Sequence, residues 1–138
     1  MTPIRMLDGV FYWVIQDRVD INDFVRSILR KEWEADIRDE GRDPTNDKWL
    51  ADLLGRDWEL RALDVADVKP ESDYIRSDRL KERRAELRRA IEGYGSVIWP
   101  MVVRAEGHLL VDGYCRFSTL REMGVSRLYA YVGSKRTR

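Results

Sequence analysis

The chain has 138 residues, of which 43% are hydrophobic and 36% are charged, and its 25 basic and 25 acidic side chains give a formal net charge of zero. A chain of this length and composition forms one packed domain, or a domain with an appendage, which excludes global disorder. The only cysteine, Cys115, excludes an internal disulfide, and with the only histidine, His108, it cannot supply the ligands of a structural zinc site.

The charges are unevenly distributed along the chain. Residues 1–57 hold 9 basic and 13 acidic side chains, whereas residues 58–138 hold 16 and 12. The second part therefore suits an anion, and its modest excess favours a small phosphorylated ligand over duplex DNA. No apolar run approaches the roughly 20 residues that cross a bilayer, and the N-terminus lacks the features of a signal peptide. We expect a cytoplasmic protein without a membrane partner.

The first elements of the chain belong to its acidic part. Residues 9–16, "GVFYWVIQ", are too short to assign by hydrophobic period, so strand and helix both remain open. Residues 20–40 carry apolar side chains at helical spacing, and Asp20 stands where an N-cap is expected. This helix is predicted to end at Gly41.

A second, shorter helix is predicted before Gly55, which stops it. Either Thr45 or Asn46 supplies its N-cap, and its leucines lie along one side. Together these segments predict that residues 1–57 form a mainly helical N-terminal extension.

From Trp58 the pattern changes. The stretch "WELRALDV" alternates between apolar and polar residues and predicts a strand, which "ADVKP" closes with a turn. Residues 79–95 predict a helix that ends at a glycine. On this helix Arg79, Arg83 and Arg84 are interpreted as part of a solvated face.

Two apolar runs, residues 101–104 and 108–112, are joined by "AEG" and predict a β-hairpin. The next stretch predicts a helix that buries three apolar side chains and stops at Gly124, and "RLYAYVG" supplies a last strand. From Trp58 the order is therefore strand, helix, hairpin, helix, strand. This order predicts an α+β fold with a small mixed sheet.

The stretch "DGYCR" places a glycine and an arginine where a helix begins. Unpaired N–H groups and the helix dipole favour an anion at such a position. Gly113 lets the backbone approach a ligand closely, and the planar guanidinium of Arg116 matches phosphate oxygens. Asp112, at the end of the strand, is placed to hold a metal, a ribose hydroxyl or a substrate hydroxyl. From these residues alone, a phosphate site and a plain turn both remain open.

Five short motifs, "VKP", "EGYG", "PMVV", "DGYCR" and "EMG", follow one another within residues 58–133. In order and spacing they resemble the nucleotide-binding domain of the ParB and sulfiredoxin superfamily. The resemblance implies a fold of that type and a nucleotide-binding domain at residues 58–138, with residues 1–57 as the extension beside it.

The stand-alone free serine kinases of this superfamily share with the chain the Lys-Pro turn followed by Glu and the "D-G-x-x-R" box. This resemblance implies a nucleotide-dependent phosphotransferase, or an NTP hydrolase, that uses ATP, ADP or CTP with Mg²⁺. The second substrate would be a small hydroxyl-bearing metabolite such as a free hydroxy amino acid. Glu71 would be the general base, and Asp112 would orient the substrate or Mg²⁺. The residues that would cradle the phosphates are Gly113, Tyr114, Cys115 and Arg116.

Two further members of the superfamily bear on the same residues. Arg76, in "YIR", matches a phosphate-contacting arginine of partition proteins, which bind CTP with this domain and DNA with another. That resemblance keeps a second function open, a nucleotide-switched DNA-binding or regulatory module, although DNA is the less favoured partner. Sulfiredoxins have their catalytic Cys directly after Gly, where this chain has Tyr114. Cys115 stands one position later, where the family has His, and is either a reactive thiol or a small buried one.

Overall fold

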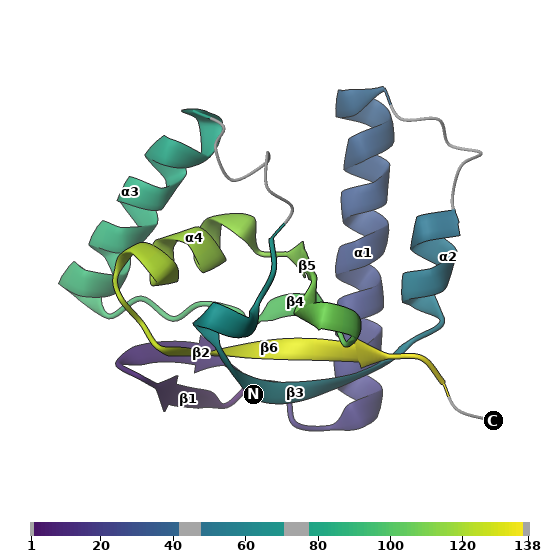
Figure 1. Ribbon diagram of the computed structural model, residues 1–138, viewed down its shortest axis with the longest axis horizontal. Helices are drawn as coiled ribbons and strands as arrows, with labels where there is room; N and C mark the ends of the chain where they lie inside the picture. The colour runs from purple at the N-terminus through teal and green to yellow at the C-terminus, as the bar shows by residue number, and fades with distance from the viewer. Residues whose placement is uncertain (1, 42–47, 71–77, 137–138) are drawn as a thin grey trace.

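The structure is a computed structural model that describes residues 2–41, 48–70 and 78–136 (Figure 1). In chain order, with η for a short 3-10 helix, the elements are β1 (Ile4–Leu7), β2 (Val10–Trp13), α1 (Arg18–Glu40), α2 (Lys48–Leu54), β3 (Asp57–Asp64), η1 (Val65–Asp67), α3 (Asp78–Tyr94), β4 (Met101–Arg104), η3 (Glu106–His108), β5 (Leu110–Asp112), α4 (Tyr114–Glu122) and β6 (Arg127–Ser134). Within these three ranges, no helix combines the length and the apolar character that crossing a bilayer requires.

A four-stranded mixed sheet in the order β3-β6-β4-β5 forms the centre of the molecule. β3 pairs antiparallel with β6 over eight residues, β6 runs parallel to β4, and β4 pairs antiparallel with β5. The strands β1 and β2 form a separate antiparallel hairpin. The predicted α+β class with a mixed sheet is confirmed.

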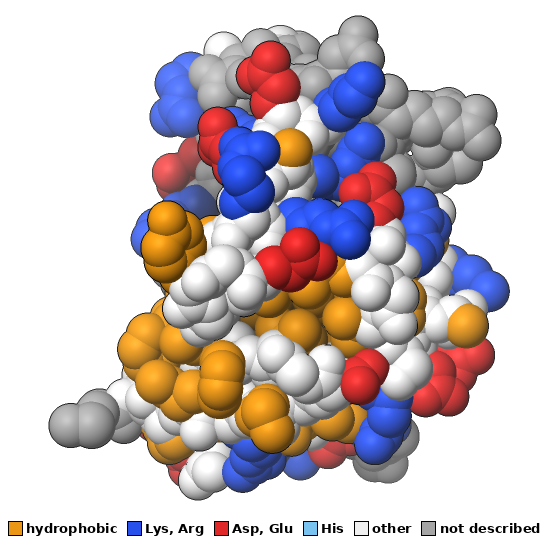
Figure 2. All heavy atoms as spheres, turned by 90° about the vertical axis from the view of Figure 1, so that its left-hand side faces the viewer, with side chains coloured by type: hydrophobic (Ala, Val, Ile, Leu, Met, Phe, Trp, Pro, Cys, Tyr) orange, Lys and Arg blue, Asp and Glu red, His pale blue; other side chains and the backbone are white. Residues whose placement is uncertain are grey.

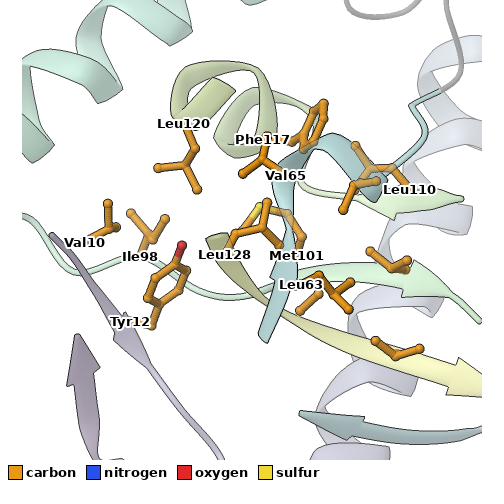
Figure 3. Close-up of a cluster of buried hydrophobic side chains, with 14 of the residues drawn as sticks. Val10, Tyr12, Leu63, Val65, Ile98, Met101, Leu110, Phe117, Leu120 and Leu128 are labelled. Atoms are coloured by element: carbon orange, nitrogen blue, oxygen red, sulfur yellow. The ribbon is translucent and has the colours of Figure 1, made fainter. Parts of the chain in front are cut away.

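Two clusters of buried side chains hold the elements together. On α1, the side chains of Ile21, Val25 and Leu29 are buried at the spacing of one helix face and pack with residues of the sheet and of α2. The second cluster joins α4, the hairpin and the sheet. Figure 3 shows it, with Phe117 and Leu120 on α4 and Tyr12 on β2. In Figure 1, α3 and α4 lie together at one end of the molecule, and α1 and α2 at the other.

The N-terminal extension is mainly helical, as predicted, and it also contains the β1–β2 hairpin. Asp8 and Gly9 adopt positive φ values of 49° and 81° between the two strands, which is how a tight hairpin turn is made. Within residues 9–16, which the sequence left open, Val10–Trp13 is therefore a strand. The division of the chain at residues 57 and 58 into two domains stays a prediction.

The long helix α1 begins two residues earlier than predicted. The carboxylate of Asp17 accepts a hydrogen bond from the backbone N–H of Asp20 at 3.1 Å, and α1 starts at Arg18. Asp17, and not Asp20, therefore holds the capping position, because an N-cap side chain binds a free N–H two or three residues further on. The predicted caps Thr45 and Asn46 lie outside the described residues.

A buried arginine joins α2 to the far end of the sheet. The side chain of Arg56 is only 1% exposed. Its guanidinium donates to both carboxylate oxygens of Glu106, at 2.7 and 3.0 Å, to Asp52 at 3.2 Å and to the carbonyl of Gly133 at 3.0 Å. A charge can be buried when it is paired and hydrogen-bonded in this way. Arg56 therefore ties the extension to the turn between β4 and β5.

Candidate functional site

The turn at Gly113 connects β5 to α4 in a left-handed backbone conformation, with φ of 97° and ψ of 31°. Residues with a side chain avoid this region because their Cβ meets the backbone. At Gly113 a Cβ would also lie 2.8 Å from Cγ of Met101 and 2.7 Å from Nη2 of Arg116. Glycine is thus required by both the conformation and the space, and the side chain of Arg116 lies directly against the turn.

Arg116 folds back over the start of its own helix. Its Nη2 donates to a carboxylate oxygen of Asp112 at 3.1 Å, and each side chain is 21% exposed. The guanidinium therefore stands at the positive end of the α4 dipole, partly shielded from water, with Asp112 as its counter-charge. The structure brings together Asp112, Gly113 and Arg116, as the motif predicts, and their roles in binding stay predictions.

Tyr114 and the residues after it supply the first backbone groups of α4. The first four N–H groups of an α-helix have no intrahelical acceptor, and the bond from Phe117 N–H to the carbonyl of Gly113, at 2.8 Å, closes the first turn. The hydroxyl of Tyr114 donates to the carbonyl of Leu110 at 3.1 Å, which fixes its ring beside β5. We therefore expect Tyr114 to serve a ligand through its main chain.

Cys115 follows in the first turn of α4, and its thiol is half-buried. Burial raises the pKa of this thiol, although a hydrogen bond with Thr119 and the positive charges of Arg83, Arg84 and Arg116 act in the opposite direction. The thiol is therefore protonated at neutral pH and is a weak nucleophile. This geometry favours the small buried thiol over a reactive one.

The Lys-Pro turn lies beside the same strand. Lys69 N–H donates to the carbonyl of His108 at 3.0 Å, and Leu110 N–H donates to the carbonyl of Lys69 at 2.8 Å. The described chain thus reaches Pro70 next to β5, the strand that ends in Asp112. The two other candidate residues, Glu71 and Arg76, lie outside the described residues, so their places in the site stay predictions.

One arginine of α3 does not lie on a solvated face, contrary to the sequence-based expectation. Arg84 is 16% exposed at its side chain, and its Nε lies 3.3 Å from a carboxylate oxygen of Glu122 on α4. This ion pair bridges the two helices at the C-terminal end of α4. Arg83 is exposed, as expected, and the side chain of Arg79 lies outside the described residues.

Met101 also packs against the turn, since its Cγ would lie 2.8 Å from a Cβ on Gly113. The sequence gives no signal for this contact, because the pairing of β4 with β5 brings the two residues together.

Within the described ranges, no group of three or more His, Cys, Asp or Glu residues is arranged to hold a metal ion. Near the turn, Asp112 is the carboxylate that faces Arg116. Mg²⁺ is often bound through only one or two carboxylates together with the phosphates of a substrate. The residues at the turn therefore fit Mg²⁺ as a companion of a nucleotide and do not form a metal site of their own.

The solved structures that are similar to this one include the following three. Two are of pNOB8-like ParB N-domains, with TM-scores of 0.46 and 0.44 and 14% identity each, over 59% and 56% of this chain. The third is sulfiredoxin from Arabidopsis thaliana, with a TM-score of 0.45 and 19% identity, over 56% of this chain and 86% of that protein. This chain spans 32% and 28% of the length of the two ParB chains.

These are the two kinds of protein whose superfamily the sequence motifs resemble. At these identities the likeness concerns the fold alone and says nothing about activity. No family model matches the sequence, and the comparison with curated proteins gives no match.

Proposed function

We propose that the chain binds the phosphates of a nucleotide at the Gly113 turn and transfers a phosphoryl group from it to the hydroxyl of a small metabolite, such as a free hydroxy amino acid. The observation that carries this proposal is the position of the Arg116 guanidinium, which lies against Gly113 at the start of α4. Guanidinium and main-chain N–H groups are the donors that phosphate oxygens take at helix N-termini. ATP, ADP and CTP all carry such phosphates.

The ion pair between Asp112 and Arg116 gives the site a defined resting state. An anion that approaches Arg116 competes with the Asp112 carboxylate, which lies 3.1 Å from Nη2. A nucleotide that carries Mg²⁺ offers both partners at once, since its phosphates suit Arg116 and its cation suits Asp112. Bound in this way, Mg²⁺ would neutralise part of the phosphate charge during transfer. We therefore expect nucleotide binding to depend on Mg²⁺ through Asp112.

Replacing Asp112 with Asn is expected to tighten ATP binding about fivefold in the presence of EDTA, because the neutral amide no longer competes for Arg116. A partly exposed ion pair of this kind contributes up to about 1 kcal/mol, which corresponds to that factor. With Mg²⁺ present, the same variant is expected to bind ATP no more tightly than the wild type. Titration calorimetry of both proteins under the two conditions measures this.

The matched control is Asp64→Asn, which removes a carboxylate at the end of β3 that is paired with Arg127 of β6 at 3.8 Å. It should leave both affinities unchanged. Two results would contradict the idea that a phosphate replaces Asp112 as the partner of Arg116. One is an equal effect of the two substitutions, and the other is an Asp112→Asn protein that binds ATP as weakly as the wild type in EDTA.

The transfer itself requires a base for the substrate hydroxyl, and we propose Glu71 for that role. As the oxygen–phosphorus bond to the substrate forms, the bond between the transferred phosphorus and the bridging oxygen of the nucleotide breaks. The hydroxyl proton passes to the Glu71 carboxylate. Phosphoryl transfer depends mainly on positioning and charge stabilisation, so one base, one arginine and one metal ion suffice.

Glu71→Gln is expected to keep nucleotide affinity within twofold, about 0.4 kcal/mol, and to lower the turnover rate at least a hundredfold, within the range that one general base contributes. Phosphorus NMR with ATP and a pool of hydroxy amino acids measures the turnover. Asp73→Asn, in the same segment, is the matched control and should remain active. Full activity of Glu71→Gln would eliminate Glu71 as the base.

A second function, nucleotide-switched binding of a polyanion without turnover, rests on the outer surface of α3. That helix exposes four basic side chains in its described part, which are Lys81, Arg83, Arg88 and Arg89. Arg88 pairs with Glu92 at 2.9 Å, and further acidic residues alternate with the basic ones, so the surface is only weakly basic. Salt-dependent DNA binding that responds to nucleotide, with no phosphorylated product, would select this function over transfer.

A further inference from the structure

The β1–β2 hairpin has one face inside the protein and one face outside. On the inner face, Val10 and Tyr12 are buried in the core. The outer face carries the cross-strand pairs Ile4 with Trp13 and Met6 with Phe11, because directly opposed residues of an antiparallel pair point to the same side. Ile4, Met6 and Phe11 are 51%, 59% and 39% exposed. The outer face is therefore an open apolar surface.

The end of α3 extends this surface. Tyr94 is 88% exposed, and the position of a Cβ on Gly95 lies 3.8 Å from the ring of Phe11, so the end of α3 adjoins the hairpin. We call the exposed residues Ile4, Met6, Phe11 and Tyr94 the hairpin patch. Figure 2 shows apolar side chains gathered over the lower part of the face that carries α3 and the hairpin, beneath a belt of charged side chains.

The hairpin patch has no charge of its own. The charged residue within β1, Arg5, belongs to the inner face, where its guanidinium lies 5.9 Å from the centre of the Tyr129 ring. Four of the six large hydrophobic side chains found exposed in the described part of the chain belong to the patch. An apolar patch of this kind is often an interaction surface.

We propose that a second copy of this chain covers the hairpin patch and forms a two-fold symmetric dimer. A two-fold axis places the hairpin patch of one copy against the hairpin patch of the other. Because the patch is apolar and uncharged, the contact leaves no charge unpaired. The formal net charge of the chain is zero, so the two copies do not repel each other as strongly charged chains do. The centre of the contact is the pair of Met6 and Phe11.

The size of the patch is sufficient for this contact. With about 200 Å² for each side chain of this size, the four exposed fractions leave roughly 500 Å² of apolar area open. A standard interface covers about 800 Å² on each partner, and about 65% of a homodimer interface is apolar, which is also roughly 500 Å². The hairpin patch therefore supplies the apolar centre of one such interface, with polar neighbours at its rim.

Sedimentation equilibrium of the full chain without nucleotide, from low micromolar to several hundred micromolar concentration, tests the proposal. The wild type is expected to approach twice the mass of one chain as concentration rises. Met6→Glu and, separately, Tyr94→Glu are each expected to weaken the dimer at least tenfold, because each places a charge at the contact from a different element. Both positions are exposed, and circular dichroism of each variant establishes that it folds.

Val19→Glu is the matched control, because Val19 is 67% exposed in the first turn of α1 and lies outside the patch. It should dimerise as the wild type does. A wild type that stays monomeric over the whole range would overturn the proposal, and so would a loss of dimer in Val19→Glu as large as in the two patch variants. Neither result bears on nucleotide binding, which is measured separately.

Discussion

Replacing Arg116 with alanine is expected to raise the dissociation constant for ATP between tenfold and a hundredfold, which corresponds to about 1.4 to 2.7 kcal/mol. The guanidinium lies against Gly113, and its removal takes away the positive side chain that the turn offers to a phosphate. The loss falls within the range for a hydrogen bond to a charged group because Arg116 is only 21% exposed. Titration calorimetry with Mg²⁺ present provides the measurement.

The matched control is Arg121→Ala on the same helix. Arg121 lies in the last turn of α4, with its guanidinium 5.2 Å from the centre of the Phe117 ring. The substitution therefore removes an equal charge at the end of the helix that is far from Gly113. It should bind ATP as the wild type does. Equal affinities of Arg116→Ala and the wild type for ATP, ADP and CTP would exclude Arg116 from the site.

The second large effect is expected on stability, where Gly133→Ala should lower the free energy of unfolding by about 2 to 3 kcal/mol. Gly133 faces Trp58 across the β3–β6 pair, and a Cβ there would lie 2.5 to 2.7 Å from three atoms of the indole ring. Trp58 is completely buried, so its ring can move only by displacing other packed side chains. Urea unfolding followed by Trp fluorescence gives the free energy.

Gly93→Ala makes the same substitution where nothing opposes it. Gly93 lies within α3. A Cβ added there would have no heavy atom within 4 Å apart from its chain neighbours and the backbone of its own helix. Alanine is favoured over glycine in a helix by up to about 1 kcal/mol, so this variant should be as stable as the wild type or more so. A Gly133→Ala protein of undiminished stability would mean that Trp58 does not pack against β6 as described.

Much of the fold from Trp58 onward could be predicted because its signals are local. The hairpin signal in residues 101–112 corresponds to β4 and β5, and the predicted stop of α4 at Gly124 corresponds to a residue with φ of 77°. Alternation in "WELRALDV" likewise gave β3. In each case the residues that determine the element are the residues within it.

Features that depend on distant partners could not be predicted. Arg56 reads as an ordinary surface arginine, and it is buried because Glu106 and Gly133, 50 and 77 positions away, surround its guanidinium. The β1–β2 hairpin was left open for a similar reason, since its buried residues belong to a cluster that also includes residues of α4 and β6. Arg84 is less exposed than expected because it pairs with Glu122 of another helix.

The candidate site shows the same division. Asp112, Gly113 and Arg116 lie within five positions of each other, so a strand followed by a glycine and a helix was enough to place them together. Met101 reaches the same turn through the sheet and could not be found in this way. Glu71 and Arg76 were chosen through a family resemblance, and their assignment still rests on it.

The most direct test of the central claim is a titration of the ¹⁵N-labelled protein with ATP and Mg²⁺, followed through its backbone amide resonances. Anion binding at the turn predicts that the amides of Gly113, Tyr114, Cys115 and Arg116 shift together and saturate, while those of β3 and α1 stay in place. Amides at the turn that do not respond at saturating ATP, or a response confined to another surface, would contradict it.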